Sequence, residues 1–175
     1  MIDSVAIHDF AVVLSRTETD ERALAFLEAT TKRLFDHILF TALRFDHPNG
    51  VMTRIYTNRE DVSPIGGTKP IPTDLWADRI MTARRCYIGY SREDIREVFP
   101  DHEALLAIGC ESVMNVPVVW QDRSLGSINL LGRERQFSEA HTGPMVIFAQ
   151  LVLPLFIGSL KRARAERDDR RFEPA

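Results

Sequence analysis

The spacing of apolar residues predicts two helices at the start of the chain. In residues 4–14, apolar side chains recur at three- and four-residue steps, which is typical of a short amphipathic helix. A longer helix is predicted to begin after Thr17 or Thr19 and to end near Phe35, because acidic residues gather in its first turn and apolar residues form one stripe. Each helix therefore has one apolar face to bury.

The last third of the chain predicts a longer and more apolar helix. It begins after Ser138, a favourable N-cap residue, and covers residues 139–160. Pro144 and Pro154 lie within it, so we expect a kink near each. Residues 161–175 carry mostly charged side chains, and we expect a charged tail that extends this helix and frays.

Between the terminal helices, β-branched and aromatic residues indicate two hairpins. The first joins Ile38–Phe45 to Val51–Thr57 through the turn residues 47–50. The second joins Glu111–Trp120 to Ser124–Leu131. Both hairpins contribute adjacent antiparallel strands to the predicted sheet.

The segment between the hairpins predicts short elements joined by loops. Prolines and glycines in residues 58–73 indicate an irregular loop of the kind that covers binding sites. Shorter elements follow in chain order: a helix over 74–83 capped by Thr73, a strand over 86–90, a helix that begins at Ser91 and stops at Pro100, and a helix over 102–108. This order of elements predicts an α+β domain with the terminal helices on one sheet face.

The composition is typical of one globular domain. The chain has 175 residues, 45% apolar and 27% charged, and a formal net charge of −3, which provides no overall field to attract nucleic acid or an anionic membrane. Asp3 stands where a secretion signal carries basic residues, and no apolar run has the length of a membrane span. We therefore expect a cytoplasmic protein in which Cys86 and Cys110 are ordinary thiols.

The sequence lacks the motifs typical of nucleic-acid, metal and phosphate binding. The basic segment near the C-terminus lacks interleaved aromatic residues, so nucleic acid is not an expected partner. The histidines are scattered without the close spacing of metal sites, and the glycines of residues 66–67 lack the lysine and hydroxyl pattern of a phosphate loop. We expect no metal, no cofactor and no membrane.

The second hairpin and the residues after it resemble the second half of a GAF domain. The matching positions are Ser112 with Val116-Pro117-Val118, then Gly126 with Ile128-Asn129-Leu130, then Phe137-Ser138-Glu139. Earlier segments agree with the family in order and length. The resemblance implies an N-terminal helical extension over residues 1–18, a GAF domain over 19–160 and a charged tail over 161–175.

This resemblance also implies an architecture. Members have a central antiparallel sheet of five or six strands, with terminal helices on one face that commonly dimerise, and loops and short helices over a pocket on the other. The function implied is a non-enzymatic sensory or regulatory module that binds a small molecule as a homodimer, its ligand unknown. A purely structural dimerisation role is an alternative.

Two specialised versions of the family differ from this chain at their functional positions. Cyclic-nucleotide-binding members agree at Asn129 and Phe137, but Leu130 replaces their lysine and His141-Thr142 replaces their two acids. Members that attach a bilin carry a Cys-His pair, and neither cysteine here is followed by histidine.

Free methionine-R-sulfoxide reductases are GAF enzymes, and they provide the enzymatic alternative for this chain. Leu106 stands at the position of one of their cysteines, and Cys110 lies at a different spacing. Val113, Asn129 and Leu131 occupy positions where these enzymes carry acids. A thiol-dependent reaction would have to use Cys86 or Cys110.

Asn115 and Asn129 are the predicted polar contacts to a ligand, because an amide both donates and accepts hydrogen bonds. They could instead bond each other or a loop backbone. A two-residue turn at residues 121–122 would place them on opposite faces, whereas a longer loop or a bulge at Pro117 would place them together.

Apolar and aromatic residues complete the predicted ligand-binding set. Aromatic rings supply apolar area with a polar tip, although such residues commonly belong to a core. Arg54 and Arg79 could neutralise an anionic ligand, or could be solvated or paired. The predicted set, besides the two asparagines, is Tyr56, Trp76, Tyr87, Tyr90, Val113 and Leu131.

Overall fold

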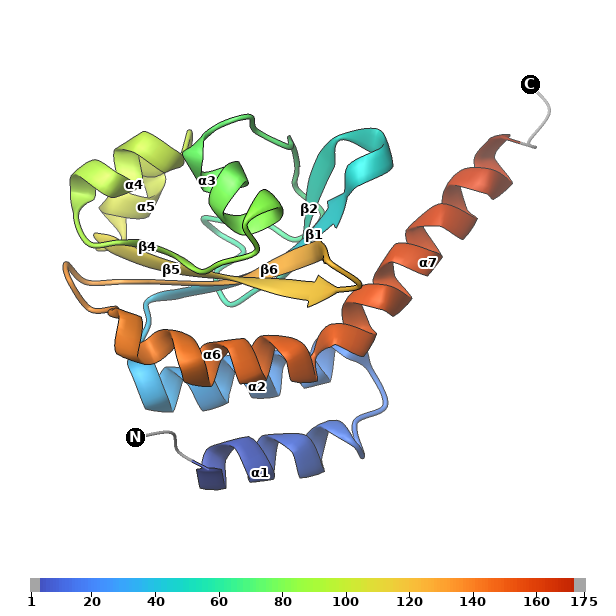
Figure 1. Cartoon of the computed structure of the whole chain (residues 1–175), viewed down its shortest axis with the longest axis horizontal. Helices are drawn as coiled ribbons and strands as arrows, with labels where there is room; N and C mark the ends of the chain where they lie inside the picture. Colours follow the sequence, from blue (N-terminus) through green and yellow to red (C-terminus); the bar gives the residue numbers. More distant parts are fainter. Residues whose placement is uncertain (1–3, 172–175) are drawn as a thin grey trace.

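A six-stranded antiparallel sheet organises the chain in a computed structural model, which describes residues 4–171 (Figure 1). The strands lie in the order β3-β2-β1-β6-β5-β4. Their bounds are β1 (Leu39–Asp46), β2 (Val51–Thr57), β3 (Thr68–Pro70), β4 (Tyr87–Gly89), β5 (Ser112–Trp120) and β6 (Arg123–Gly132). The predicted α+β class and the six-stranded central sheet are confirmed.

Helices lie on both faces of this sheet. One face carries the terminal helices α1 (Ser4–Leu14), α2 (Asp20–Phe35), α6 (Glu139–Leu151) and α7 (Leu153–Arg171). The other carries α3 (Leu75–Ala77), the π-helical turn η2 (Asp78–Thr82), α4 (Arg92–Val98) and α5 (His102–Ala107). A 3₁₀ turn, η1 (His47–Asn49), joins β1 to β2. In Figure 1, α1 lies outside α2 and α6, and the end of α7 extends beyond the sheet.

The helix ends follow the local capping signals. Thr19 caps α2 by accepting a hydrogen bond from the Arg22 N–H, and Asp36 ends the helix in the left-handed region at φ 50°. Ser91 and Asp94 form the predicted capping box at the start of α4. Gly109, at φ 85°, follows α5.

The long C-terminal helix breaks once. α6 continues through Pro144 without interruption, whereas Val152 separates α6 from α7 and the two axes are bent by 49°. Pro154 lies in the first turn of α7, where its missing N–H costs no helical hydrogen bond. Among residues 4–171, no single helix is both long and apolar enough to cross a membrane; the bent α6–α7 pair reaches that length and composition only when its two helices are joined.

The second hairpin has the two-residue turn that the sequence offers as one alternative, and a bulge at a position that the sequence does not indicate. Trp120 pairs with Arg123 across a two-residue turn whose residues have φ 47° and 60°. Pro117 pairs in register with Ser127, so the predicted bulge at Pro117 is wrong; the register shifts between Val118 and Val119 instead. The pairing of β4 with β5 stops at Asn115, so Pro117 lies beyond the part of β5 that pairs with β4.

Two expectations for the middle segment also need correction. Residues 58–73 are not wholly irregular, because β3 pairs with residues 51–53 at the sheet edge. The helix predicted over 74–83 is capped by Asp74 rather than Thr73: its carboxylate accepts the Ala77 N–H at 2.9 Å. That helix changes after one turn into the π-helical turn η2.

An apolar core fills the space between the sheet and the terminal helices. Phe10, Phe40, Phe148 and Phe156 are fully buried in it. Gly126 is required in β6 because an added Cβ would lie 2.2 Å from the Leu43 carbonyl oxygen and 2.3 Å from the Phe156 ring. Close packing therefore fixes the sheet against these helices.

The predicted N-terminal extension and C-terminal tail both contact the predicted GAF domain. Phe10 of α1 lies in the main core, and α7 continues past residue 160 as one helix. Arg167 of α7 pairs with the buried Asp46 of β1. The division into residues 1–18, 19–160 and 161–175 stays a prediction, and residues 1–3 and 172–175 lie outside the described residues.

Candidate functional site

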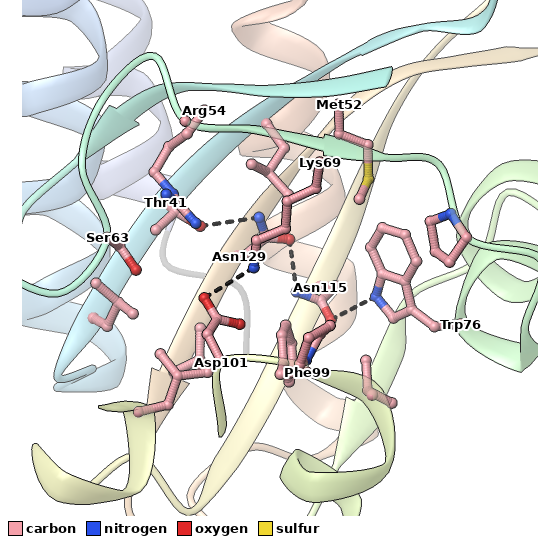
Figure 2. Close-up of a pocket in the computed structure, with 18 of the residues that line it drawn as sticks. Thr41, Met52, Arg54, Ser63, Lys69, Trp76, Phe99, Asp101, Asn115 and Asn129 are labelled. Carbon is pink, nitrogen blue, oxygen red and sulfur yellow. Dashed lines mark hydrogen bonds and ion pairs between the residues drawn. The ribbon is translucent and has the colours of Figure 1, made fainter. Parts of the chain in front are cut away.

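A cavity of about 470 Å³ lies between the sheet and the short helices of its second face (Figure 2). Its floor comes from β1, β2, β5 and β6, and its other walls come from β3, α3 and the segment between α4 and α5. Most of the lining side chains are apolar. They include Leu39, Leu43, Met52, Val98, Phe99, Leu105 and Leu131.

A chain of hydrogen bonds crosses the cavity floor. The Trp76 indole N–H donates to Asn115 Oδ1 at 2.9 Å, Asn115 Nδ2 donates to Asn129 Oδ1 at 2.6 Å, and Asn129 Nδ2 donates to Thr41 Oγ1 at 3.1 Å. Figure 2 shows these four side chains in sequence from α3 across β5 and β6 to β1. All four are at least nine-tenths buried. We call them the polar chain.

Strand register creates the polar chain. Asn115 pairs directly with Asn129, and Asn129 pairs directly with Thr41. A two-residue turn alone would have placed Asn115 opposite Ile128; the shift between Val118 and Val119 moves the pairing by one residue. Because side chains alternate between faces, that single shift brings both amides into the cavity.

Trp76 sets the direction of these bonds. An indole N–H can only donate, so the Asn115 atom facing it must be the carbonyl oxygen. The Asn115 amide nitrogen then faces Asn129, and the same logic orients Asn129 toward Thr41. Each amide NH₂ uses one of its two N–H groups in the chain, which leaves one N–H on each asparagine for a ligand.

Three charged side chains lie at the cavity. Lys69 of β3 pairs with Asp101, before α5, at 2.9 Å. Arg54 of β2 donates from Nη1 to the Pro64 carbonyl at 3.1 Å. Burial lowers the pKa of Arg54, and the charge of Asp101 opposes that shift. Arg54 Nε and Asp101 Oδ1 are buried and have no hydrogen-bond partner among the described residues.

Four of the eight predicted ligand-binding residues line this cavity. These are Trp76, Asn115, Asn129 and Leu131. The two asparagines bond each other, as one of the alternatives held, and they also face the open space. Whether they bind a ligand stays a prediction.

The other four predicted residues lie elsewhere. Tyr56 faces the terminal helices and packs edge-on against Phe40 at 5.7 Å, because the β1–β2 pairing shifts between Ala42 and Leu43. Val113 and Tyr87 pack in apolar clusters under the short helices, and Tyr90 is 41% exposed.

The predicted ligand-binding set lacks several charged and polar residues of the cavity wall, among them Thr41, Lys69 and Asp101. Thr41 could have been found from the alternation of β1, since Leu39 and Leu43 share its face. Arg54, for which the sequence leaves open a role in neutralising an anionic ligand or a solvated or paired side chain, lines the cavity, whereas Arg79 does not. Lys69 and Asp101 carry no local signal, because they meet only through β3 and the α4–α5 connection.

The two cysteines do not line this cavity. Cys110 is fully buried, and burial raises the pKa of its thiol to about 12. Burial likewise raises the pKa of Cys86 to about 11. Both thiols are protonated near neutral pH, which is the form without nucleophilic reactivity.

Among residues 4–171, no group of three or more histidine, cysteine or acidic side chains is placed to hold a metal ion. The cavity offers a ligand hydrogen-bonding groups, charged groups and apolar surface.

No protein family model and no curated protein matches this sequence. Solved structures do match in fold. The GAF domain from Acinetobacter phosphoenolpyruvate-protein phosphotransferase has a TM-score of 0.71 at 11% identity, over 88% of this chain and 92% of that one. The phycocyanobilin-bound GAF domain from a cyanobacterial phytochrome has a TM-score of 0.67 at 16% identity, over 92% and 95%.

An enzyme is also among the similar structures. Free methionine-R-sulfoxide reductase from Neisseria meningitidis, solved in complex with its substrate, has a TM-score of 0.60 at 13% identity, over 90% of this chain and 89% of that one. Identities this low show the fold and leave the activity open. The sheet order, the two helical layers and these comparisons together show that the chain has the GAF-domain fold.

Proposed function

We propose that this protein is a non-enzymatic sensory or regulatory module that binds a small molecule in the cavity over its sheet. It acts in the cytoplasm as a homodimer, and ligand binding changes its terminal helices, which transmit that change to a partner. The observation that carries the proposal is the cavity of about 470 Å³, apolar in its walls and crossed by the polar chain. Its size lies in the range of small-molecule sites, about 300–1,000 Å³.

The polar chain supports ligand binding, because burying polar side chains costs free energy that apolar side chains at the same positions would not. Four buried polar side chains are held by one another on a surface that apolar residues could have filled. Each asparagine keeps an N–H that the described residues do not use. The phytochrome domain of the same fold holds phycocyanobilin, which gives a precedent for a ligand in this architecture.

An enzymatic function of the reductase type has weaker support. It needs an activated thiolate close to the substrate, whereas burial raises the pKa of both thiols and neither lines the cavity. Cys86→Ser and Cys110→Ser proteins should keep the rise in melting temperature that the ligand gives the wild type. Thiol-dependent sulfoxide reduction that either replacement abolished would support the enzymatic alternative instead.

Exposed apolar side chains on the terminal helices support the homodimer. Val12 of α1 is 36% exposed and Val146 of α6 is 39% exposed. Val146→Glu should weaken a dimer that uses this layer, and light scattering after size exclusion would measure it. A dimer that formed without any ligand effect would favour the structural dimerisation role.

Two measurements test ligand binding. Native mass spectrometry of the purified protein should find a retained small molecule, or a metabolite panel should raise the melting temperature, because a ligand that binds only the native state stabilises it. Asn115→Ala should reduce the shift, with Asn49→Ala, outside the cavity, as a control. A panel without any shift, together with no retained mass, would refute the proposal.

A further inference from the structure

We infer that the molecule bound in this cavity is a small organic carboxylate, whose carboxyl group pairs with Arg54 while its apolar body lies between the sheet and the short helices. The inference rests on the proposed function, because it names the chemical class of ligand for the same cavity.

Arg54 is a partly buried cation without an acidic partner of its own. Its guanidinium keeps its charge at neutral pH, and its Nε is buried without a hydrogen-bond partner. Among the described residues, its side-chain hydrogen bond goes to the Pro64 carbonyl, and no carboxylate forms an ion pair with it. Removing a charge from water without pairing it is unfavourable, so an anion in the cavity would offset that cost.

The charges around Arg54 leave an excess of positive charge at that end of the cavity. Lys69 and Asp101 pair with each other at 2.9 Å, so this group holds two cations and one anion. Asp74 also lines the cavity, but its carboxylate caps α3 by accepting the Ala77 N–H, two residues from Trp76. The positive end is therefore the end formed by β2 and β3.

Hydrogen-bond donors extend from the positive end along the floor. Arg54 pairs with Leu43 on β1, and Thr41 lies two residues away on the same face. Figure 2 shows the Arg54 side chain reaching from β2 toward the Thr41 end of the polar chain. The spare amide N–H groups of Asn115 and Asn129 follow. A carboxylate offers two acceptor oxygens and no donor, which complements this surface.

The carboxylate of Asp101 favours a cationic ligand, whereas the neighbouring Lys69 disfavours one. Its Oδ1 is buried without a partner and would accept a hydrogen bond from a ligand. A ligand ammonium group there would lie beside Lys69, which is 2.9 Å from the other carboxylate oxygen. Like charges repel at such distances, so a neutral hydroxyl suits Asp101 better than a cation does.

Matched sets of compounds test the inference. Each set shares one apolar body and ends in a carboxylate, a primary amide or a primary alcohol: 3-phenylpropanoate, indole-3-acetate, hexanoate and octanoate head the four sets. Thermal shift and calorimetry should find at least one carboxylate that binds roughly tenfold or more tightly than its amide and alcohol, as expected for a charge-assisted bond. Arg54→Gln should remove that preference.

Arg59→Gln is the matched control. Arg59 lies just after β2, does not line the cavity and pairs with Asp61, so its replacement should leave the preference intact. A second measurement uses only the wild-type protein, so it does not depend on whether the Arg54→Gln protein folds. Nuclear magnetic resonance of an isotope-labelled carboxyl carbon should show that the bound acid stays ionised to a lower pH than the free acid.

Three results would overturn the inference. One is a panel in which no carboxylate binds, another is equal binding of carboxylate and alcohol, and the third is a carboxyl group whose pKa rises on binding. If neutral or cationic compounds bind in the metabolite panel in any of these cases, the proposed binding function stands and only the ligand class is wrong.

Discussion

Neighbouring residues of one strand lie on opposite faces of the sheet, and the two faces are packed differently. On β6, Ile128 and Leu130 lie in the apolar core beneath the terminal helices, whereas Asn129 and Leu131 face the cavity. The helix-side core is filled by stacked and edge-on rings, such as Phe10 against Phe148 at 5.5 Å. The cavity side keeps about 470 Å³ of open space.

This difference separates stability from binding. Close-packed apolar side chains contribute most of a domain's stability, and each lost contact is felt there. A cavity gives up such contacts on its open side, and its buried polar groups add specificity rather than net stability. Mutations on the two faces should therefore differ in both size and kind of effect.

The largest effect should come from the helix side. Phe148→Ala should lower the free energy of unfolding by about 3–5 kcal/mol, because the ring is fully buried among other rings. Leu43→Ala on the cavity side should cost less than about 2 kcal/mol, since this residue already borders empty space. Urea unfolding of both proteins measures the contrast, and equal losses would break it.

A pH effect should also arise on the helix side. His37 packs near Phe40 and α2, and burial lowers its pKa from 6.5 to about 4. Between these values the unfolded chain binds a proton that the folded chain does not. Stability should therefore fall as the pH drops from about 6.5 to about 4, by up to about 3 kcal/mol.

His37→Gln isolates this contribution, because acidic residues also titrate in part of that range. The difference in unfolding free energy between the variant and the wild type should change with pH across that interval. A constant difference would show that His37 is not held neutral in the folded protein.

Substitutions in the polar chain should lower the free energy of unfolding less than Phe148→Ala does, and their effects should be coupled to one another. Asn115→Leu leaves the Trp76 indole N–H without its partner, and Trp76→Phe leaves Asn115 Oδ1 without its donor, so each single change should cost about 1–3 kcal/mol. The double mutant should lose less than the sum, with a coupling of at least about 0.5 kcal/mol. Additive losses would mean that solvent replaces this bond.

Most of the fold could be predicted from local sequence signals. Caps at Thr19 and Ser91, the turn residues between β1 and β2, and the motif around Pro117 placed the main elements and the fold. The three-residue β3 and the π-helical turn η2 escaped, because both depend on pairing and packing rather than on local preference.

The site could be predicted only in part, because strand register decides which side chains share a face. One shift in β5–β6 brought Asn115 and Asn129 together, and another in β1–β2 turned Tyr56 toward the helices. No short pattern in the sequence marks either shift. Groups that meet through long-range contacts, such as Lys69 and Asp101, are similarly hidden.

The most direct test of the central claim is fluorescence from Trp76, which lies at the cavity wall and bonds Asn115. The chain has two tryptophans, and the other, Trp120, is 48% exposed at the hairpin end. A Trp120→Phe protein makes Trp76 the single reporter. Titration with the metabolite panel should give a saturable change in Trp76 emission for each compound that raises the melting temperature. Compounds that stabilise the protein and leave Trp76 emission unchanged would contradict binding in this cavity.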